Sequence, residues 1–579
     1  MNEKNKIILK DAFKNFTLDQ DKVKTPEETT FEFKNKLKSL NLDILEQTVR
    51  IDNGRLDIPV FFSICGKDAI SATNTKKQMG KGATPAQAEA SAVMELAERF
   101  SFFSFCKEEK NFTVKKYKDL NKEEVIPFEL IAKSVHDESQ DVEEARKIFE
   151  NMEFKWTWGF NLSQNKEILI PFDWFFEINE FNGPSAGNCQ EEAISQGICE
   201  IVERHVSSII SNQKVKVPLI DIYSASDIMV LEMLKKYEKA GIKLFVSDFT
   251  LDMGIPSIGV LAYDPSTFPK KSEIVWTAGT TPSPQKAFSR ALTEVAQLAG
   301  DFNSGSNYLA SGLPKFRDLS QADFIINNNS TISINTLPDI SNANIKIEVE
   351  NCLKALKRKD MEVILINTTH KELQIPAFYT IIPGAHFRER AANTNILMFL
   401  GKHITKNNSP DNAIYKLSEI EKIFPEKYFI KFYLGTSYLS LDNPSTALTY
   451  FKKALNLNPK EEDMASIYSY MGVCLKDMGD YHKAIEILKE GERIDKERTD
   501  IYNLLGFCYF KLKDHEKSIE YFKNVLKIDP TSAIDYANVA SNYREIGEKD
   551  KAIVNYEIAL ALDPSIQFAK ENLKKLKQR

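Results

Sequence analysis

NCQEEAISQGICEIVER, residues 188–204, has two counterparts in the same chain. They are TPAQAEASAVMELAER at residues 84–99 and SPQKAFSRALTEVAQ at residues 283–297. Alignment on Glu200, Glu95 and Glu294 places alanine seven residues earlier in each, a polar residue four residues earlier, and Glu or Gln three residues later. Because positions −4, 0 and +3 of an α-helix lie within about 60° of one another, the pattern predicts three helices that each carry one polar stripe.

The stripes of the first two helices are rich in carboxylates: Glu95, Glu98, Glu192, Glu200 and Glu203. Carboxylate oxygens suit Mg²⁺, and no set of histidines or thiolates occurs at a spacing that would favour zinc. Magnesium held in this way usually also takes substrate phosphates, which Arg204 and Arg290 could bind in a bidentate manner. The alternative is that E-x-x-E-R only forms solvated ion pairs on helix surfaces.

Small and polar residues precede the second helix, in the loop FNGPSAGNCQEEA at residues 181–193. They allow close backbone approach, and the free amides of a helix N-terminus attract anions. Most loops of this kind are only turns, but this one lies directly before the acidic stripe. Gly80-Lys81-Gly82 resembles part of a phosphate-binding loop. It lacks the glycine five residues before Gly80 and the Ser or Thr after Lys81 that the complete pattern requires.

The C-terminal third has a different periodicity. A small residue recurs 34, 37, 34 and 34 residues apart, at Gly401, Gly435, Gly472, Gly506 and Ala540. A second small residue follows each after twelve residues, and a large apolar residue follows four residues later. Proline closes four of the five units. A 34-residue repeat of this composition is typical of tetratricopeptide helix–turn–helix units, which bury their apolar faces against their neighbours.

Residues upstream of about 390 alternate short β-rich runs, such as IPVFFSIC, KLFVSDF, PSIGVLAY and EVILINTT, with long helices. This alternation predicts an α+β domain.

The chain of 579 residues is too long for one core. Its formal charge of −6 argues against direct nucleic-acid binding. No apolar run reaches the length of a membrane span. The first residues lack the apolar core of a signal peptide and the seven cysteines are scattered, which favours the cytoplasm.

These residues together resemble the YcaO family of ATP-using enzymes that activate backbone amides. The resemblance rests on G-K-G-A-T-x-x-x-A-x-x-S-A-x-x-E-x-x-E-R (80–99) and N-G-x-S-A-G-N-x-x-x-E-A…E-x-x-E-R (182–204). R-A-L-T-E (290–294) and I-P-G (382–384) support it. It implies an α+β YcaO-type catalytic domain followed by an all-α tetratricopeptide-repeat solenoid. The implied bounds are 1–393 for the ATP-binding domain (core about 20–390), 394–566 for five repeats and 567–579 for a capping helix.

The resemblance also implies roles for individual residues. Mg²⁺ would be held around the triphosphate of ATP by Glu95, Glu98, Glu192, Glu200 and Glu203. ATP would be contacted by Lys22, Thr29, Ser91, Ser185, Asn188, Arg204 and Arg290. Arg204 and Arg290 would also be catalytic, because their charge would stabilise phosphoryl transfer. The reaction would be attack of a thiol, hydroxyl or sulfide on a peptide amide, as in cyclodehydration or thioamidation.

The implied partners are a protein or peptide substrate, a sulfur-transfer protein and a second copy of the chain in a homodimer. A different class of function is also open. The chain would then be an accessory scaffold for methylthiolation of a ribosomal protein, in which ATP is bound and the repeats recruit a partner.

Overall fold

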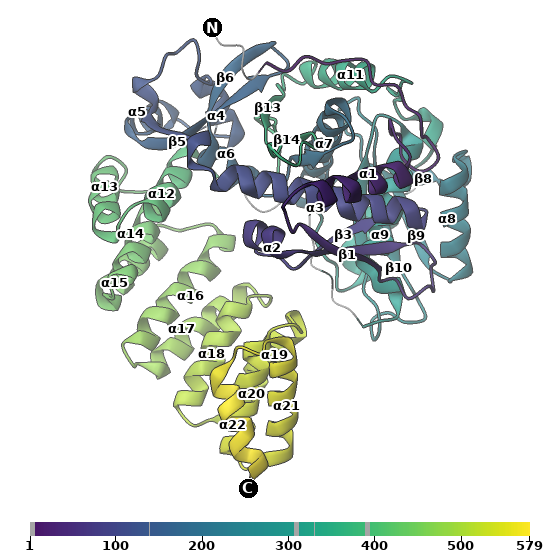
Figure 1. The fold of residues 1–579 in the computed structure, drawn as a ribbon. Helices are drawn as coiled ribbons and strands as arrows, with labels where there is room; N and C mark the ends of the chain where they lie inside the picture. The colour runs from purple at the N-terminus through teal and green to yellow at the C-terminus, as the bar shows by residue number, and fades with distance from the viewer. Residues whose placement is uncertain are drawn as a thin grey trace. The chain divides into compact units, whose positions relative to one another are not determined.

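A computed structural model describes residues 6–137, 139–305, 308, 312–328, 330–387 and 394–578. The chain divides into two compact units, residues 1–396 and 397–579, and each is described by itself (Figure 1). No helix among the described residues is long and apolar enough to cross a membrane.

The described part of the first unit contains three β-sheets. The first has the order β1 (Leu45–Arg50), β2 (Val60–Cys65), β3 (Lys77–Lys81). The second has the order β11 (Val275–Thr280), β10 (Ser257–Tyr263), β9 (Lys243–Asp248), β8 (Leu219–Asp221), β12 (Thr331–Ser333). The third has the order β4 (Thr113–Lys116), β5 (Glu153–Asn161), β13 (Ile364–Asn367), β14 (Ala377–Ile381), β7 (Pro184–Ala186), with β6 (Lys166–Pro171) also paired to β5. The four β-rich runs singled out in the sequence form β2, β9, β10 and β13, so the α+β prediction is confirmed.

The helices of this unit cover the sheets. They are α1 (Pro26–Ser39), α2 (Lys67–Thr73), α3 (Pro85–Lys107), α4 (Phe128–Ser134), α5 (Val142–Asn151), α6 (Phe172–Asn179), α7 (Gln190–Gln213), α8 (Ile228–Lys239), α9 (Pro284–Ala299), α10 (Asp323–Ile326) and α11 (Ile345–Lys357). Helix α3 packs on β2 and β3, α7 on β7 and β14, and α9 on β10 and β11. The three helices that share the sequence pattern therefore each lie on a different sheet.

Each of these three helices follows its strand by the same short connection. Three residues separate β3 from α3 (82–84), β7 from α7 (187–189) and β11 from α9 (281–283). The start of α3 is capped, because the Thr84 side chain accepts a hydrogen bond from Gln87 N and Pro85 occupies the first turn. One strand–turn–helix unit is thus used three times, and each use brings a polar stripe to an equivalent place.

The small residues of the shared pattern make the contact between helix and strand. A Cβ on Gly80 of β3 would lie 2.0 Å from Ala92 N of α3, and one on Gly279 of β11 would lie 2.3 Å from Ala287 O of α9. In α7 the close contact uses Gly197, where a Cβ would lie 2.2 Å from Thr380 Oγ1 of β14. Small residues therefore make the closest contacts between each of the three helices and the sheet that it covers.

Substituting Gly80 by alanine is expected to destabilise the first unit by about 3 kcal/mol, because backbone atoms of α3 occupy the space that the methyl group needs. Gly54→Ala is the control, since nothing lies within 4 Å of its Cβ and only the cost of its left-handed φ of 78° remains. Denaturant unfolding monitored by circular dichroism measures both. An equal decrease in the free energy of unfolding in the two variants would contradict close strand–helix packing at Gly80.

The second unit is a series of helices: α12 (Ile396–Asn407), α13 (Pro410–Ile423), α14 (Tyr428–Ser440), α15 (Pro444–Leu455), α16 (Glu461–Asp477), α17 (Tyr481–Ile494), α18 (Thr499–Lys511), α19 (His515–Ile528), α20 (Ala533–Glu545), α21 (Lys549–Leu562) and α22 (Gln567–Gln578). Helices pack as the pairs α14–α15, α16–α17, α18–α19 and α20–α21. Three of the recurring glycines, Gly435, Gly472 and Gly506, lie where paired helices touch: a Cβ on Gly435 would lie 2.6 Å from the Phe451 ring, and one on Gly472 2.4 Å from Leu488. The all-α prediction is confirmed, whereas the exact repeat bounds stay predictions, and Arg579 of the predicted cap lies outside the described residues.

Candidate active site

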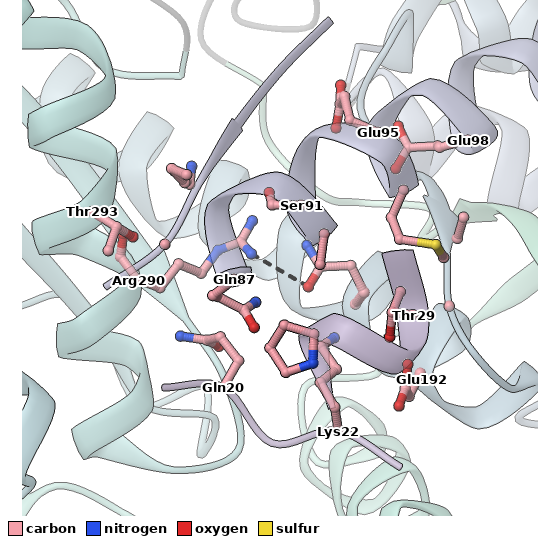
Figure 2. Close-up of a pocket in the computed structure, with 18 of the residues that line it drawn as sticks. Gln20, Lys22, Thr29, Gln87, Ser91, Glu95, Glu98, Glu192, Arg290 and Thr293 are labelled. Atoms are coloured by element: carbon pink, nitrogen blue, oxygen red, sulfur yellow. Dashed lines mark hydrogen bonds between the residues drawn. The ribbon is translucent and has the colours of Figure 1, made fainter. Parts of the chain in front are cut away.

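A cavity of about 320 Å³ lies between α3, α7 and α9 (Figure 2). Its size falls in the range of about 300–1,000 Å³ that is usual for small-molecule sites. Its wall is completed by β3, by the loop before α7, by the segment before α1 and by the first turn of α1. Figure 2 shows Lys22 and Gln20 from this leading segment at one side of the cavity and Glu95 and Glu98 of α3 at another.

The structure brings ten of the twelve predicted site residues to this cavity: Lys22, Thr29, Ser91, Glu95, Glu98, Asn188, Glu192, Glu200, Arg204 and Arg290. Ser185 and Glu203 are not among the residues that line it. Sequence positions as far apart as 22 and 290 therefore meet in one place.

Carboxylates and guanidinium groups alternate around the cavity. Arg99 Nε lies 2.9 Å from Glu95 Oε1 and 3.4 Å from Glu98 Oε1, so it connects the two acids of α3. Arg204 Nη2 lies 3.7 Å from Glu200 Oε1 on α7. The acids are therefore not solvated surface pairs, because they and their cations line a shared concave site.

Like charges remain close in spite of these pairs. Burial raises the pKa of the Glu98 carboxyl well above its ordinary range, and the charges of Glu95 and Glu200 raise it further, while Arg99 opposes them. Burial likewise raises the pKa of Glu200, against Arg204 and Arg99. Ionising this group of acids has a free-energy cost that an additional cation would reduce.

Glu192 holds neighbouring segments of the cavity wall together by hydrogen bonds. Its Oε1 accepts a hydrogen bond from Val23 N at 2.6 Å, and its Oε2 accepts from Asn188 N at 2.9 Å and Asn188 Nδ2 at 3.1 Å. Thr29 Oγ1 in turn lies 3.1 Å from Asn188 Oδ1. Glu192 thus joins the N-terminal segment to the loop before α7, and both of its oxygens already accept hydrogen bonds.

Glu203 and Ser185 lie behind the wall. Glu203 Oε2 accepts from Thr280 N at 3.2 Å and from Arg290 Nε at 3.3 Å, so it fixes the arginine that reaches the cavity. Ser185 is fully buried on β7, and its Oγ lies 3.5 Å from Phe378 O. Direct contact of either residue with a ligand stays a prediction.

Several lining residues were not predicted as site residues: Asp19, Gln20, Lys81, Gln87, Arg99, Gln196 and Glu294. Lys81 forms an ion pair with Glu294 of α9. Burial lowers the pKa of Lys81 to about 7, and Arg290 acts in the same direction. Glu294 and Arg99 belong to the helix pattern that the sequence displays, whereas Asp19 and Gln20 carry no sequence signal.

The residues fit a phosphate-bearing ligand with a divalent cation. The buried Nε of Arg204 has no hydrogen-bond partner within the part of the chain that the structure describes. Its N–H group can therefore donate a hydrogen bond to an anion such as a phosphate. Glu95, Glu98 and Glu200 supply hard oxygen ligands on the same cavity. Among the described residues no three His, Cys, Asp or Glu side chains are grouped as a metal-ligand set. Glu95 is paired with Arg99, and Glu200 with Arg204. A cation would therefore compete with those arginines for the carboxylates.

Comparison with known proteins decides the family. Residues 79–386, more than half of the chain, match the YcaO cyclodehydratase family, which is described as ATP- and Mg²⁺-binding. The chain belongs to the YcaO family. The resemblance read from the sequence is thereby confirmed, and with it membership of an ATP-dependent enzyme family with ATP and Mg²⁺ as its ligands.

Relatives match this YcaO protein over different shares of its length. An uncharacterized protein of Methanothermobacter thermautotrophicus is 25% identical over 62% of this chain and 93% of its own length. The "Ribosomal protein S12 methylthiotransferase accessory factor YcaO" of Escherichia coli is 29% identical over 24% of this chain and 23% of its own length. A solved heterocyclase in complex with substrate and cofactor has a TM-score of 0.54 and 19% identity over 66% of this chain and 55% of its own, which supports the fold.

The second unit also has a family match. Residues 432–535 match the tetratricopeptide-repeat domain of cytochrome c-type biogenesis protein H. The expectation of a YcaO domain followed by repeats of tetratricopeptide type is confirmed.

Proposed function

We propose that this YcaO protein uses Mg²⁺-ATP to activate a backbone amide of a protein or peptide. The observation that carries the proposal is the cavity in which acids from α3 and α7 alternate with arginines from α3, α7 and α9. When bound, Mg²⁺-ATP would supply the phosphoryl group that makes the amide oxygen a leaving group after a thiol, hydroxyl or sulfide has added to the carbonyl carbon.

The chain's own residues would bind and orient the ligands. Glu95, Glu98 and Glu200 would hold Mg²⁺, since their carboxylates line the cavity and repel one another without a cation. Arg204 and Arg290 would bind the phosphates and stabilise the charge that develops during transfer. Lys22, Ser91 and Asn188, which line the same cavity, would complete the nucleotide contacts. Glu203 would keep Arg290 oriented through their contact of 3.3 Å.

The origin of the phosphate oxygen tests this proposal. Proteins that co-purify with the chain from its native cells are incubated with it and Mg²⁺-ATP in water labelled with heavy oxygen. Unlabelled phosphate is expected, because its fourth oxygen comes from the amide. Substrate that has lost water or exchanged oxygen for sulfur should appear in equal amount by mass spectrometry. Phosphate whose fourth oxygen comes from water in every molecule would overturn amide activation.

A second function is favoured by the name of the E. coli relative and by the repeats. As an accessory factor, the chain would bind ATP and recruit a sulfur-transfer protein or a second copy of itself through α12–α22. Deletion of residues 397–579 would then abolish partner co-purification and leave ATP binding intact, because the two units are separately compact. Partner capture that survives the deletion would exclude this role of the repeats.

A further inference from the structure

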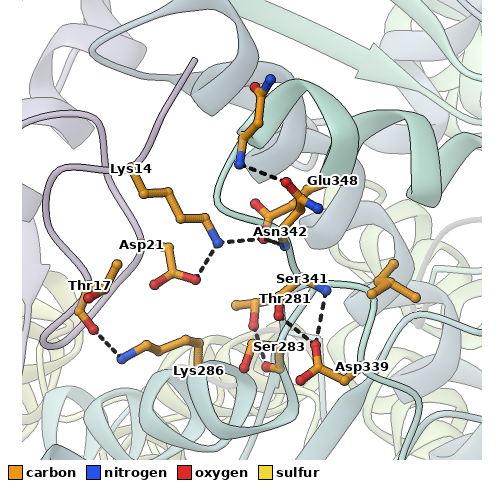
Figure 3. Close-up of polar contacts among 12 residues, drawn as sticks. Lys14, Thr17, Asp21, Thr281, Ser283, Lys286, Asp339, Ser341, Asn342 and Glu348 are labelled. Atoms are coloured by element: carbon orange, nitrogen blue, oxygen red, sulfur yellow. Dashed lines mark hydrogen bonds and ion pairs between the residues drawn. The ribbon is translucent and has the colours of Figure 1, made fainter. Parts of the chain in front are cut away.

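Residues 16–22 form a closed loop that places Gln20 and Lys22 at the cavity. Its ends pair as in an antiparallel bridge: Phe16 N donates to Lys22 O at 3.0 Å, and Lys22 N donates to Phe16 O at 2.8 Å. Lys14 Nζ supports this closure from outside, since it lies 2.7 Å from Asp21 Oδ2 and 2.5 Å from Glu348 Oε1 of α11 (Figure 3). The loop is therefore a defined structure rather than an extended tail.

Asp19, at the centre of the loop, is 1% exposed. Its carboxylate fixes the loop to the turn before α3 and to α9. Its Oδ2 accepts a hydrogen bond from Ala83 N, in the turn before α3, at 2.7 Å. Its Oδ1 accepts from Ser289 Oγ of α9 at 2.9 Å. One carboxylate thus connects the start of α3 to the middle of α9, next to the residue Gln20 that lines the cavity.

Lys286 of α9 holds the same loop from its other side. Its Nζ donates to Thr17 O at 2.6 Å and to Leu18 O at 3.1 Å, and it forms an ion pair of 2.7 Å with Asp227 (Figure 3 shows the contact with Thr17). Lys286 is 8% exposed. Its charge also partly balances the buried carboxylate of Asp19, whose pKa burial raises.

We propose that Asp19 and Lys286 are positioning residues for the nucleotide: they fix the loop of residues 16–22 on α9 so that Gln20 and Lys22 face bound Mg²⁺-ATP. The inference rests on the proposed ATP site. Asp19 would act on the nucleotide through Gln20 and Lys22, although its own side chain also borders the cavity.

A double-mutant cycle tests this action. Calorimetric titration of the full chain with Mg²⁺-ATP should show an affinity at least about tenfold lower for Asp19→Ala, because a buried charged acceptor and two hydrogen bonds are lost. In a Gln20→Ala/Lys22→Ala background the same substitution should change affinity by less than about twofold, since the side chains it positions are gone. A full tenfold loss in that background would overturn the proposal, as it would show action by direct contact or by general destabilisation.

Two further variants separate positioning from stability. Asp19→Asn can still accept from Ala83 N and donate to Ser289 Oγ, so it should retain affinity within about threefold. Arg55→Met is the matched control, because Arg55 forms a partly buried ion pair of 2.5 Å with Asp264, and neither residue lines the cavity. It should lower the melting temperature without changing ATP affinity. Wild-type affinity in Asp19→Ala would overturn the inference alone, whereas a wild-type chain that binds no Mg²⁺-ATP would overturn the proposed function as well.

Discussion

Replacing Glu98 by glutamine is expected to stabilise the protein in the absence of Mg²⁺ by about 1 kcal/mol and to weaken Mg²⁺-ATP binding by at least about 100-fold. Removal of the Glu98 charge causes both effects: it favours folding and disfavours cation binding. Glu98 is 9% exposed and lies beside Glu95 and Glu200, so its ionisation opposes folding when no cation is present. The same negative charge is what a bound cation would require.

The stabilisation of Glu98→Gln should depend on pH. The folded-state pKa of Glu98 is raised, so above pH 4.5 the unfolded chain ionises first and the wild-type protein loses stability as pH rises. Glutamine removes this loss. Its advantage should be largest near pH 8 and should disappear as pH falls toward 4.5, which thermal unfolding over this range measures.

Glu89→Gln is the matched control on the same helix. Glu89 lies outside the cavity lining, and its Oε1 accepts from Lys34 Nζ at 2.6 Å and from Thr48 Oγ1 at 2.6 Å. Its substitution should lower stability slightly and leave Mg²⁺-ATP affinity unchanged. Tighter or unchanged Mg²⁺-ATP binding by Glu98→Gln would contradict the assignment of Glu98 as a metal ligand.

Replacing Arg290 by methionine is expected to lower ATP turnover by at least about 100-fold, because the guanidinium that we propose binds the phosphates is removed from the cavity. Arg290 Nε lies 3.3 Å from Glu203 Oε2, and its Nη1 donates to Gln196 Oε1 at 3.3 Å. Arg290→Lys should not restore turnover, since a lysine has no planar fork for bidentate contact.

Loss of Arg290 also leaves Glu203 without its contact to that guanidinium, so a folding defect must be separated from a catalytic one. The double variant Arg290→Met/Glu203→Gln removes both charges together and should recover most of the stability. Its turnover should stay low. Recovery of turnover together with stability would show that Arg290 serves folding rather than the phosphates.

Local sequence was sufficient to locate the three site helices, because their polar and small residues repeat in one register. The helices extend beyond the pattern, to Lys107 in α3 and Gln213 in α7, since no glycine or proline follows Arg99 or Arg204 to end them. Gly80 was interpreted from sequence as part of a phosphate-binding loop and of the family motif. Its packing against α3, like that of Gly279 against α9, is seen only in the structure.

Contacts between distant segments could not be read from sequence. Asp19 joins residues 83 and 289, and nothing in its surrounding residues indicates this. Lys81 was considered only as part of a phosphate-binding loop, whereas its partner Glu294 lies on another helix. Ser185 is occupied in the packing of β7 against α7, which a motif match does not reveal. Motifs thus predicted which helices form the site, and tertiary contacts decide which residues line it.

A crystal structure of the full chain with Mg²⁺ and a non-hydrolysable ATP analogue is the most direct measurement of the site. The nucleotide is expected between α3, α7 and α9, with phosphates at Arg204 and Arg290 and with metal on Glu95, Glu98 and Glu200. The carboxylates should then have left the arginines that hold them in the structure described above. A nucleotide bound elsewhere, or bound in this cavity with metal on none of these three carboxylates, would contradict the proposed site.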